Sequence, residues 1–215
     1  MKRIVKIKIY LLAILMIGSC GKDESIVLLP ESGLMNGGFE YGNLSGWDYL
    51  GEAAVVQLLD TLKPFEGNYM AMLSTGMNRV WTHGSISQTF HVKEEHVYLS
   101  FQWNMIFEEF ADQMTMQPLD FFRVSIIRED GSEQMLVMLN AFIVAAQFDA
   151  FPQPPGNMLP VSPSVFPNAY MTGWQEATID VSNYQGQEVT IQFDVIGREN
   201  SEYRIGVVVD EVDLF

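Results

Sequence analysis

Short runs in which apolar and polar residues alternate recur along this 215-residue chain, and they constrain its fold more than any other feature. The clearest run covers residues 98–107, where one parity is apolar throughout and the other carries Ser100, Gln102 and Asn104. Successive side chains of a strand point to opposite faces of a sheet, so this run predicts a strand with one face in a core. Similar runs predict strands over residues 121–128, 189–195 and 203–214.

The segments between these runs contain turn formers, and no window of a dozen residues has helical spacing. The Asp130-Gly131 pair predicts a hairpin that leads into a further strand over residues 133–139. Many short strands with one apolar face predict an all-β fold, in which two antiparallel sheets pack as a sandwich.

One long segment departs from this pattern. Residues 141–171 are apolar but include six prolines, which cannot serve the middle of a sheet. We expect a long proline-rich loop there, inside the sandwich domain. Loops of this length are uncommon in compact domains and are often functional.

The N-terminus has the features of an export signal. Basic residues up to Lys8 precede an apolar run over residues 9–17, and Gly18-Ser19-Cys20 follows. The run is too short to span a membrane, which takes about twenty apolar residues.

The ending Ile17-Gly18-Ser19-Cys20 resembles the lipobox of bacterial lipoproteins. The resemblance implies cleavage after residue 19 and lipid, such as palmitate, on Cys20, the only cysteine of the chain. We expect a signal peptide over residues 1–19, a tether over 20–34 and one domain over 35–215. The protein would then be lipid-anchored in the bacterial cell envelope, at the outer membrane or the cell surface.

The charge of the chain excludes some partners. The formal net charge is −15, and loss of the four basic residues of the signal would bring it to −19. Nucleic-acid binding depends on Lys and Arg, so we expect no nucleic-acid partner. Contact with a membrane is expected through the lipid alone, because an acidic surface is repelled by anionic lipids.

Several short motifs, taken in order, resemble a known family. They are Asn36-Gly37-Gly38-Phe39-Glu40, Leu44-Ser45-Gly46-Trp47, Pro64-Phe65-Glu66-Gly67-Asn68-Tyr69, Ser85-Ile86-Ser87-Gln88-Thr89-Phe90, Gly173-Trp174 and Val207-Val208-Val209-Asp210-Glu211-Val212. The order resembles the jelly-roll carbohydrate-binding modules of xylanases and glucanases, and MAM domains end in a similar way. The likeness covers the chain from about Met35 to Phe215.

This resemblance implies a structural calcium ion. Its ligands would be Glu40 and Asp210, with oxygens from the turn at Glu66-Gly67. The residues themselves point the same way, since Asp210 shares parity with Val212 and Leu214 and is expected to face inward, where an unpartnered carboxylate is costly. Alternatively, the two acids accept backbone N–H groups and cap the terminal strands.

Polar residues of the predicted strands are candidates for ligand binding. They offer hydrogen-bond donors and acceptors for sugar hydroxyls and are expected to line one outer sheet face: Gln102, Asn104, Arg123, Ser125, Gln192 and Asp194. Sugar rings also stack on flat aromatic side chains, for which Trp81 and Phe121 are candidates. Trp81 would equally well plug one end of the sandwich.

The sequence offers little for catalysis. His83, His91 and His96 lie in no zinc-protease pattern, and no nucleophile-elbow motif occurs. Glu108 and Glu109 are adjacent on a strand and point to opposite faces, so they cannot flank one glycosidic bond. We therefore expect a glycan-binding protein without enzyme activity. The alternative is an adhesion or assembly module that binds another protein at the cell surface.

Overall fold

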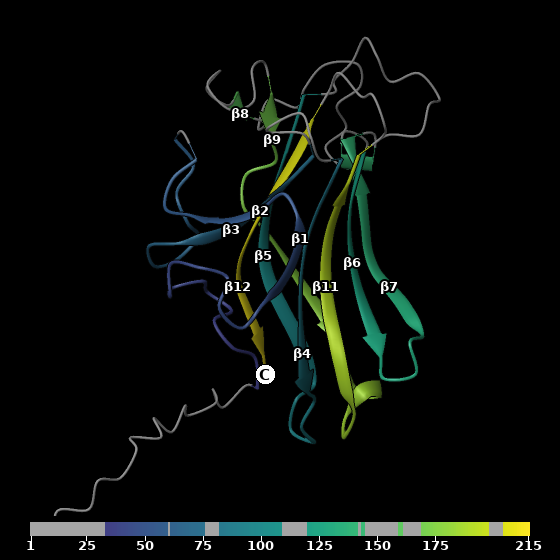
Figure 1. Cartoon of the computed structure of the whole chain (residues 1–215). Helices are drawn as coiled ribbons and strands as arrows, with labels where there is room; N and C mark the ends of the chain where they lie inside the picture. The colour runs from purple at the N-terminus through teal and green to yellow at the C-terminus, as the bar shows by residue number, and fades with distance from the viewer. Residues whose placement is uncertain are drawn as a thin grey trace, which may run out of the picture.

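A computed structural model describes residues 33–59, 61–75, 82–108, 120–141, 143–144, 159–160, 169–197 and 204–215 (Figure 1). The predicted signal peptide, Cys20, Trp81 and most of the proline-rich loop lie outside the described residues. In the part of the chain that is described, no helix is both long and apolar enough to cross a membrane.

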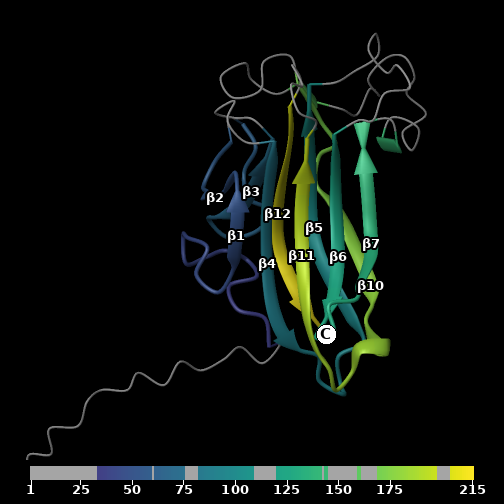
Figure 2. The same cartoon turned by 45° about the vertical axis from the view of Figure 1, so that its right-hand side comes forward.

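Two antiparallel sheets form the fold, as the alternating runs predict (Figure 1, Figure 2). The first is five-stranded, with strands in the order β1 (Asp48–Gly51), β4 (His83–His91), β11 (Glu188–Ile196), β6 (Phe121–Arg128) and β7 (Glu133–Asn140). The second is seven-stranded, in the order β2 (Ala53–Val56), β3 (Met70–Ser74), β12 (Ile205–Leu214), β5 (Tyr98–Phe107), β9 (Tyr170–Met171) and β8 (Leu159–Pro160), with β10 (Gln175–Asp180) also paired to β5.

The predicted strand bounds are confirmed for β5 and β6, and β11 extends one residue beyond the prediction at each end. The hairpin at Asp130-Gly131 is also confirmed, because Gly131 N donates to Arg128 O at 2.8 Å and Gly131 has φ of 80°. The last strand begins at Ile205, with Arg204 outside it.

The core lies between the sheets and consists of the apolar parity of each strand. Phe101 of β5 meets Phe193 of β11 edge-on, with ring centroids 5.0 Å apart. Trp47 packs against Phe193, and Trp103 against Phe122 of β6. These aromatic pairs join one sheet to the other, and burial of such rings is a main source of stability.

A second apolar cluster covers part of the outer face of the seven-stranded sheet. It includes Leu59, Leu62, Met72, Ile106 and Val208. Ala169 and Met171, at the end of the proline-rich segment, belong to it as well, and Trp174 packs against it. The described end of that segment therefore returns to the sheet as β9. Trp174 therefore packs against this second cluster and not in the core between the sheets.

The two sheets are connected at one edge by a single residue. Glu52 separates β1 of the first sheet from β2 of the second. Its backbone N donates to His83 O at 3.0 Å, its carbonyl accepts from Ser74 N at 3.1 Å, and its carboxylate accepts from the Ser74 hydroxyl at 2.8 Å. These bonds hold the crossing between the sheets in place.

Candidate functional site

Four acids from distant parts of the sequence meet near the bulge of β12, and we call them the acidic corner: Glu40, Glu66, Asp210 and Glu211. Glu40 follows the first described turn, Glu66 lies in the loop before β3, and the other two lie on β12. The corner therefore joins the first and last parts of the described chain, as the family resemblance implies.

Asp210 is fully buried and is hydrogen-bonded by backbone alone. Its Oδ2 accepts from Phe65 N at 2.9 Å and Glu66 N at 3.3 Å, and its Oδ1 accepts from Glu211 N at 2.9 Å. Burial and, to a smaller extent, the charge of Glu211 raise the pKa of Asp210 to about 7, against the lowering effect of these hydrogen bonds. The carboxylate is thus hydrogen-bonded but its negative charge is not balanced by a basic group in these contacts.

Glu40 binds the other end of the same loop. Its Oε1 accepts from Asn68 N at 2.8 Å and Tyr69 N at 2.9 Å, and its Oε2 accepts from the Asn68 amide at 3.2 Å. Slight desolvation raises the pKa of Glu40, but these hydrogen bonds outweigh it, and the pKa lies below its usual value. The loop over residues 65–69 is therefore held by one acid at each end.

Gly67 in this loop is required by both space and backbone conformation. It has φ of 63°, and a Cβ there would lie 2.4 Å from Glu40 Oε1. The position of the Glu40 carboxylate therefore depends on a residue without a side chain, since other residues rarely adopt such a φ.

The orientation predicted for Asp210 from the sequence is wrong, because β12 contains a bulge at this point. The register shifts between Asp210 and Asp213, and Glu211 has φ of 49°. Val209 and Val212 both belong to the core between the sheets, so strict alternation fails here. Asp210 is buried as predicted, but on the outer side of its sheet, under the 65–69 loop, and not beside Val212 and Leu214.

The bulge also gives Glu211 a place in the corner. A Cβ on Gly38 would lie 2.7 Å from Glu211 Oε1, so this carboxylate packs against the first turn. Desolvation raises the pKa of Glu211, and the charges of Glu66, Asp213 and Glu40 raise it further. The sequence analysis did not include Glu211 among the cation ligands, because its contribution depends on its positive φ at the bulge.

The negative charge of the acidic corner suits a cation, but its side chains alone do not form a complete metal site. Among the described residues, no group of three or more His, Cys, Asp or Glu side chains is arranged to hold a metal ion. A calcium ion here would need backbone carbonyl oxygens in addition to carboxylates, which is common for calcium.

A second buried acid lies on the outer face of the five-stranded sheet. Asp194 of β11 is fully buried, and its neighbours on this face surround it with side chains. Arg123 of β6 donates to its Oδ2 from Nε at 3.2 Å and Nη2 at 2.8 Å, and Gln192 donates to its Oδ1 at 2.7 Å. His83 Nε2 lies 3.2 Å from the same Oδ1.

These groups form one connected set, which we call the polar face: His83, Ser85, Arg123, Glu133, Gln192 and Asp194. Arg123 also pairs with Glu133 of β7 at 3.2 Å. Desolvation raises the pKa of Asp194, but hydrogen bonds from Gln192, Arg123, Ser85 and His83 outweigh it, so the pKa lies below its usual value. Asp194 is therefore ionised and fixed in position at neutral pH.

The structure brings together only part of the predicted ligand-binding set. Arg123, Gln192 and Asp194 share the polar face, whereas Gln102 and Asn104 lie on β5 in the other sheet. The expectation of one common face is wrong, since alternation assigns a residue to a side of its strand but does not say which sheet holds the strand. Asn104 is also fully buried, beneath Met171 and Thr172.

His83 and Ser85 of the polar face were missed in the sequence analysis. The signal was present, because polar His83, Ser85 and Ser87 alternate with Gly84 and Ile86. Trp81, the predicted aromatic platform, lies outside the described residues but precedes His83 by only two positions. Phe121, the other aromatic candidate, is half-buried. It pairs with Ile196 on one side of β11, and His83 pairs with Ile196 on the other side.

One polar atom beside the residues of the polar face has no hydrogen-bond partner. The Ser125 hydroxyl is buried and makes no hydrogen bond, although Ser125 pairs with Gln192 across the sheet. A buried hydroxyl without a partner costs about 1–3 kcal/mol. The hydrogen-bonding capacity of the polar face is therefore not fully used.

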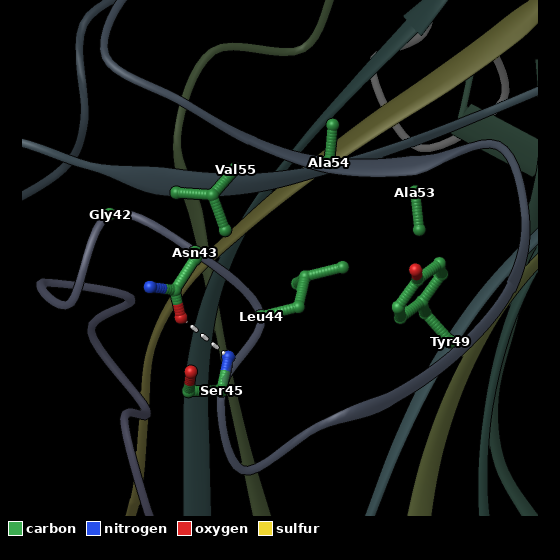
Figure 3. Close-up of a pocket in the computed structure, with 8 residues that line it drawn as sticks. All are labelled: Gly42, Asn43, Leu44, Ser45, Tyr49, Ala53, Ala54 and Val55. Atoms are coloured by element: carbon green, nitrogen blue, oxygen red, sulfur yellow. Dashed lines mark hydrogen bonds between the residues drawn. The ribbon is translucent and has the colours of Figure 1, made fainter.

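A hollow of about 570 Å³ lies at the sandwich edge, between the turn at residues 42–45 and strands β1 and β2 (Figure 3). Leu44, Tyr49 and Val55 contribute its larger side chains, and its eight lining residues include no acid, Lys, Arg or His. The hollow offers apolar contact but little for the chemistry of a charged ligand.

Comparisons with solved structures agree with this architecture. The carbohydrate-binding module TmCBM61, solved in complex with β-1,4-galactotriose, is 16% identical to the chain, with a TM-score of 0.50 over 86% of this chain and 99% of that one. The non-crystalline cellulose-specific module CBM28 is 16% identical, with a TM-score of 0.43 over 82% and 90%. The K2 cleaved adhesin domain of Lys-gingipain is 12% identical, with a TM-score of 0.47 over 79% and 88%.

The likeness to TmCBM61 confirms the predicted fold class, a jelly-roll β-sandwich. At this level of identity it concerns the fold alone. No protein-family model matches the chain, and no curated protein matches it either.

Proposed function

We propose that this protein is a non-catalytic glycan-binding module, and that the polar face is where it binds. The observation that carries the proposal is the arrangement around Asp194. A buried, ionised carboxylate fixes Arg123 and Gln192 in place on an outer sheet face. Amide, guanidinium and imidazole groups held in this way can exchange hydrogen bonds with sugar hydroxyls at little entropic cost.

The charge of the polar face indicates the kind of glycan. Arg123 is neutralised by Asp194 and Glu133, and Asp48 lies on the same face opposite Ser87. The face thus has more acids than fixed cations, and it disfavours uronic acids and sulfated sugars. Neutral polysaccharides suit it best, and TmCBM61, which shares the fold, was solved with a neutral galactose trimer.

We further propose that the acidic corner holds calcium and that lipid on Cys20 anchors the module at the bacterial envelope. The unbalanced charge of buried Asp210, beside Glu211, supports the cation. When bound, calcium would neutralise these carboxylates, with Glu40, Glu66, Asp210 and Glu211 as candidate ligands together with nearby carbonyls. The residues 17–20 support the anchor.

Affinity electrophoresis in gels containing galactan, xylan, soluble cellulose or a uronate polymer tests the binding proposal. We expect retardation in at least one neutral gel and none in the uronate gel. Gln192→Ala and Trp81→Ala should each weaken it, by up to about tenfold for the loss of one aromatic contact. Glu129→Gln, at an exposed position in the turn between β6 and β7, serves as a folded control.

No retardation in any neutral polysaccharide, or retardation that Gln192→Ala and Trp81→Ala leave unchanged, contradicts the binding proposal. For the anchor, mass spectrometry of membrane-extracted protein should find acyl chains on Cys20, and Cys20→Ser should release the protein from membranes. An unmodified Cys20 in that fraction overturns the anchor alone.

A further inference from the structure

The open part of the outer face of the seven-stranded sheet has no role in the function proposed above. We call it the β10 face: Ser100 and Gln102 of β5, Glu176 and Thr178 of β10, and Asp213 of β12. Register brings these residues side by side, since Glu176 pairs with Gln102, and Ser100 pairs with both Thr178 and Asp213. The second apolar cluster covers the neighbouring part of the sheet and leaves this part open.

An exposed aromatic pair bounds the β10 face at each end. At one end, Phe65 meets the Trp174 ring edge-on, with centroids 5.9 Å apart, and the side chain of Phe65 is 48% exposed. The Trp174 indole is fixed by a hydrogen bond from its Nε1 to Lys63 O at 3.2 Å. This pair is a preformed aromatic surface, not a mobile side chain.

At the other end, Tyr98 packs against Phe215 with centroids 5.7 Å apart. These rings are 42% and 56% exposed. Two backbone hydrogen bonds from nitrogen to oxygen hold the residues together, Tyr98 to Phe215 at 2.9 Å and Phe215 to Tyr98 at 3.0 Å. Large apolar side chains this exposed, in pairs around a polar surface, mark a binding surface.

The spacing of the two pairs suits a linear ligand. Trp174 precedes β10, and Asp180 at the end of β10 pairs with Tyr98. Six residues of extended strand place the pairs roughly 20 Å apart. Between them lie the hydroxyls of Ser100 and Thr178, the amide of Gln102 and carboxylates. β10 and β12 pair with β5 on its two sides, so β5 presents side chains here and not a free edge.

The charge of this face selects the ligand. Glu176, Asp180 and Asp213 are exposed on or beside it, and hydrogen bonds from Ser182 hold the pKa of Asp180 below its usual value. None of the five residues that make up the face is basic. A surface of this kind attracts cations, and aromatic faces also attract bound ammonium groups.

We propose that the β10 face binds a glycan of amino sugars with free, protonated amines. Aromatic faces at both ends stack on sugar rings, the carboxylates pair with the ammonium groups, and Gln102 and Thr178 bind hydroxyls. The ligand class and the sheet both differ from those of the polar face, so this proposal goes beyond the function proposed above.

Calorimetric titration with glucosamine oligomers, from dimer to hexamer, tests the proposal against N-acetylated oligomers of the same length. Acetylation removes the charge and keeps the sugar backbone. We expect affinity for the free amines to rise with length until both aromatic pairs are spanned, and to fall steeply with added salt. The acetylated hexamer should bind at least about tenfold more weakly, or 1.4 kcal/mol, because it loses several exposed ion pairs that are each worth less than this.

Variants locate the site. Phe65→Ala and Tyr98→Ala should each weaken hexamer binding several-fold, and Glu176→Gln with Asp213→Asn should weaken it and reduce its salt dependence. Glu129→Gln, in the β6–β7 hairpin on the other sheet, removes one charge without touching the face and should change nothing. Circular dichroism confirms that each variant is folded.

Three results would overturn the proposal: no binding of the amine hexamer, equal binding of both forms, or binding that Gln192→Ala abolishes and the β10-face variants leave unchanged. Equal displacement by an oligolysine of the same charge would show a general cation surface and would also overturn the glycan assignment. Each of these leaves retention on neutral polysaccharides unaffected, so the function proposed above is judged separately.

Discussion

Asp194 and Asp210 are both fully buried aspartates on central strands, one in each sheet, and the protein treats them in opposite ways. Asp194 is surrounded by the side chains of Arg123, Gln192, Ser85 and His83, and its pKa lies below the usual value. Burial, together with the charge of Glu211, raises the pKa of Asp210 to about 7, and its hydrogen bonds from backbone N–H groups only partly oppose this rise.

This difference shows in which region the charge of the buried aspartate is balanced by groups of the chain itself. The charge of Asp194 is balanced within the chain, so the carboxylate serves to position its neighbours. The charge of Asp210 is not balanced by the groups that contact it, and a cation from outside would remove the deficit. The first region is therefore expected to depend on side chains, and the second on solution conditions.

The largest effect is expected for Asp194→Asn. The change leaves Arg123 beside a neutral amide in a mostly buried setting, and breaking such a pair costs about 3 kcal/mol. Urea unfolding measures the loss. Glu133→Gln removes the exposed partner of the same arginine and should cost less than about 1 kcal/mol. Similar losses for the two variants would mean that Asp194 is not the centre of the polar face.

Removal of calcium should affect only the other region. A ligand that binds the folded state alone stabilises it by about 2.7 kcal/mol at one hundred times its Kd. The Tm of the wild-type protein should fall on addition of a chelator and recover with calcium, while the Tm of Asp210→Asn should respond to neither. A wild-type Tm that is unchanged by chelator removes calcium from the acidic corner.

Gly67→Ala should sharpen the contrast by disturbing Glu40. The strained φ costs about 1–2 kcal/mol for a residue with a side chain, and the new Cβ also displaces a carboxylate that three hydrogen bonds hold. Gly131→Ala is the matched control, since Gly131 has φ of 80° but open space around it. The difference in unfolding midpoint between the two variants isolates the contact with Glu40, and equal midpoints would show that this contact adds nothing.

The smallest effect is the acid sensitivity that Asp194 confers. Its folded-state pKa lies below the unfolded value of 3.8, so its stabilising effect is full above that value and is lost as pH falls through the folded pKa. Wild-type protein should lose part of its stability below about pH 4, and Asp194→Asn should lose less over the same range. Parallel curves for the two proteins would contradict the assignment.

The fold followed from the sequence because alternation is a local property. The bounds of β5 and β6 can be read from parity and turn residues alone. The sheet to which each strand belongs depends on contacts far apart in the chain, and this is why Gln102 and Asn104 were assigned to the wrong face. The orientation of Asp210 failed for a different reason, since a single residue, Glu211, adopts a positive φ that no pattern of polarity reveals.

The part of the candidate site that could be predicted from the sequence is the pair of acids that lie in recognisable motifs. Asp210 was expected to be buried and to approach Glu40, and both acids bind the 65–69 loop. The backbone N–H groups in that loop form the capping arrangement that the sequence left open beside calcium, and the charge of Asp210 remains for a cation to balance. Glu211 could not be assigned to the corner without knowledge of its positive φ, whereas the alternation of polar and apolar residues around His83 is visible in the sequence.

The position of β12 has a kinetic consequence. This strand follows all the others in sequence, yet it lies between β3 and β5, and its Ile205 bonds to Thr75, 130 positions earlier. The seven-stranded sheet stays split until residues 205–214 have been synthesised and have paired, and its open edges are exposed to aggregation in the meantime. A pairing over such a distance is also slow to form, so we expect the seven-stranded sheet to be completed late in folding.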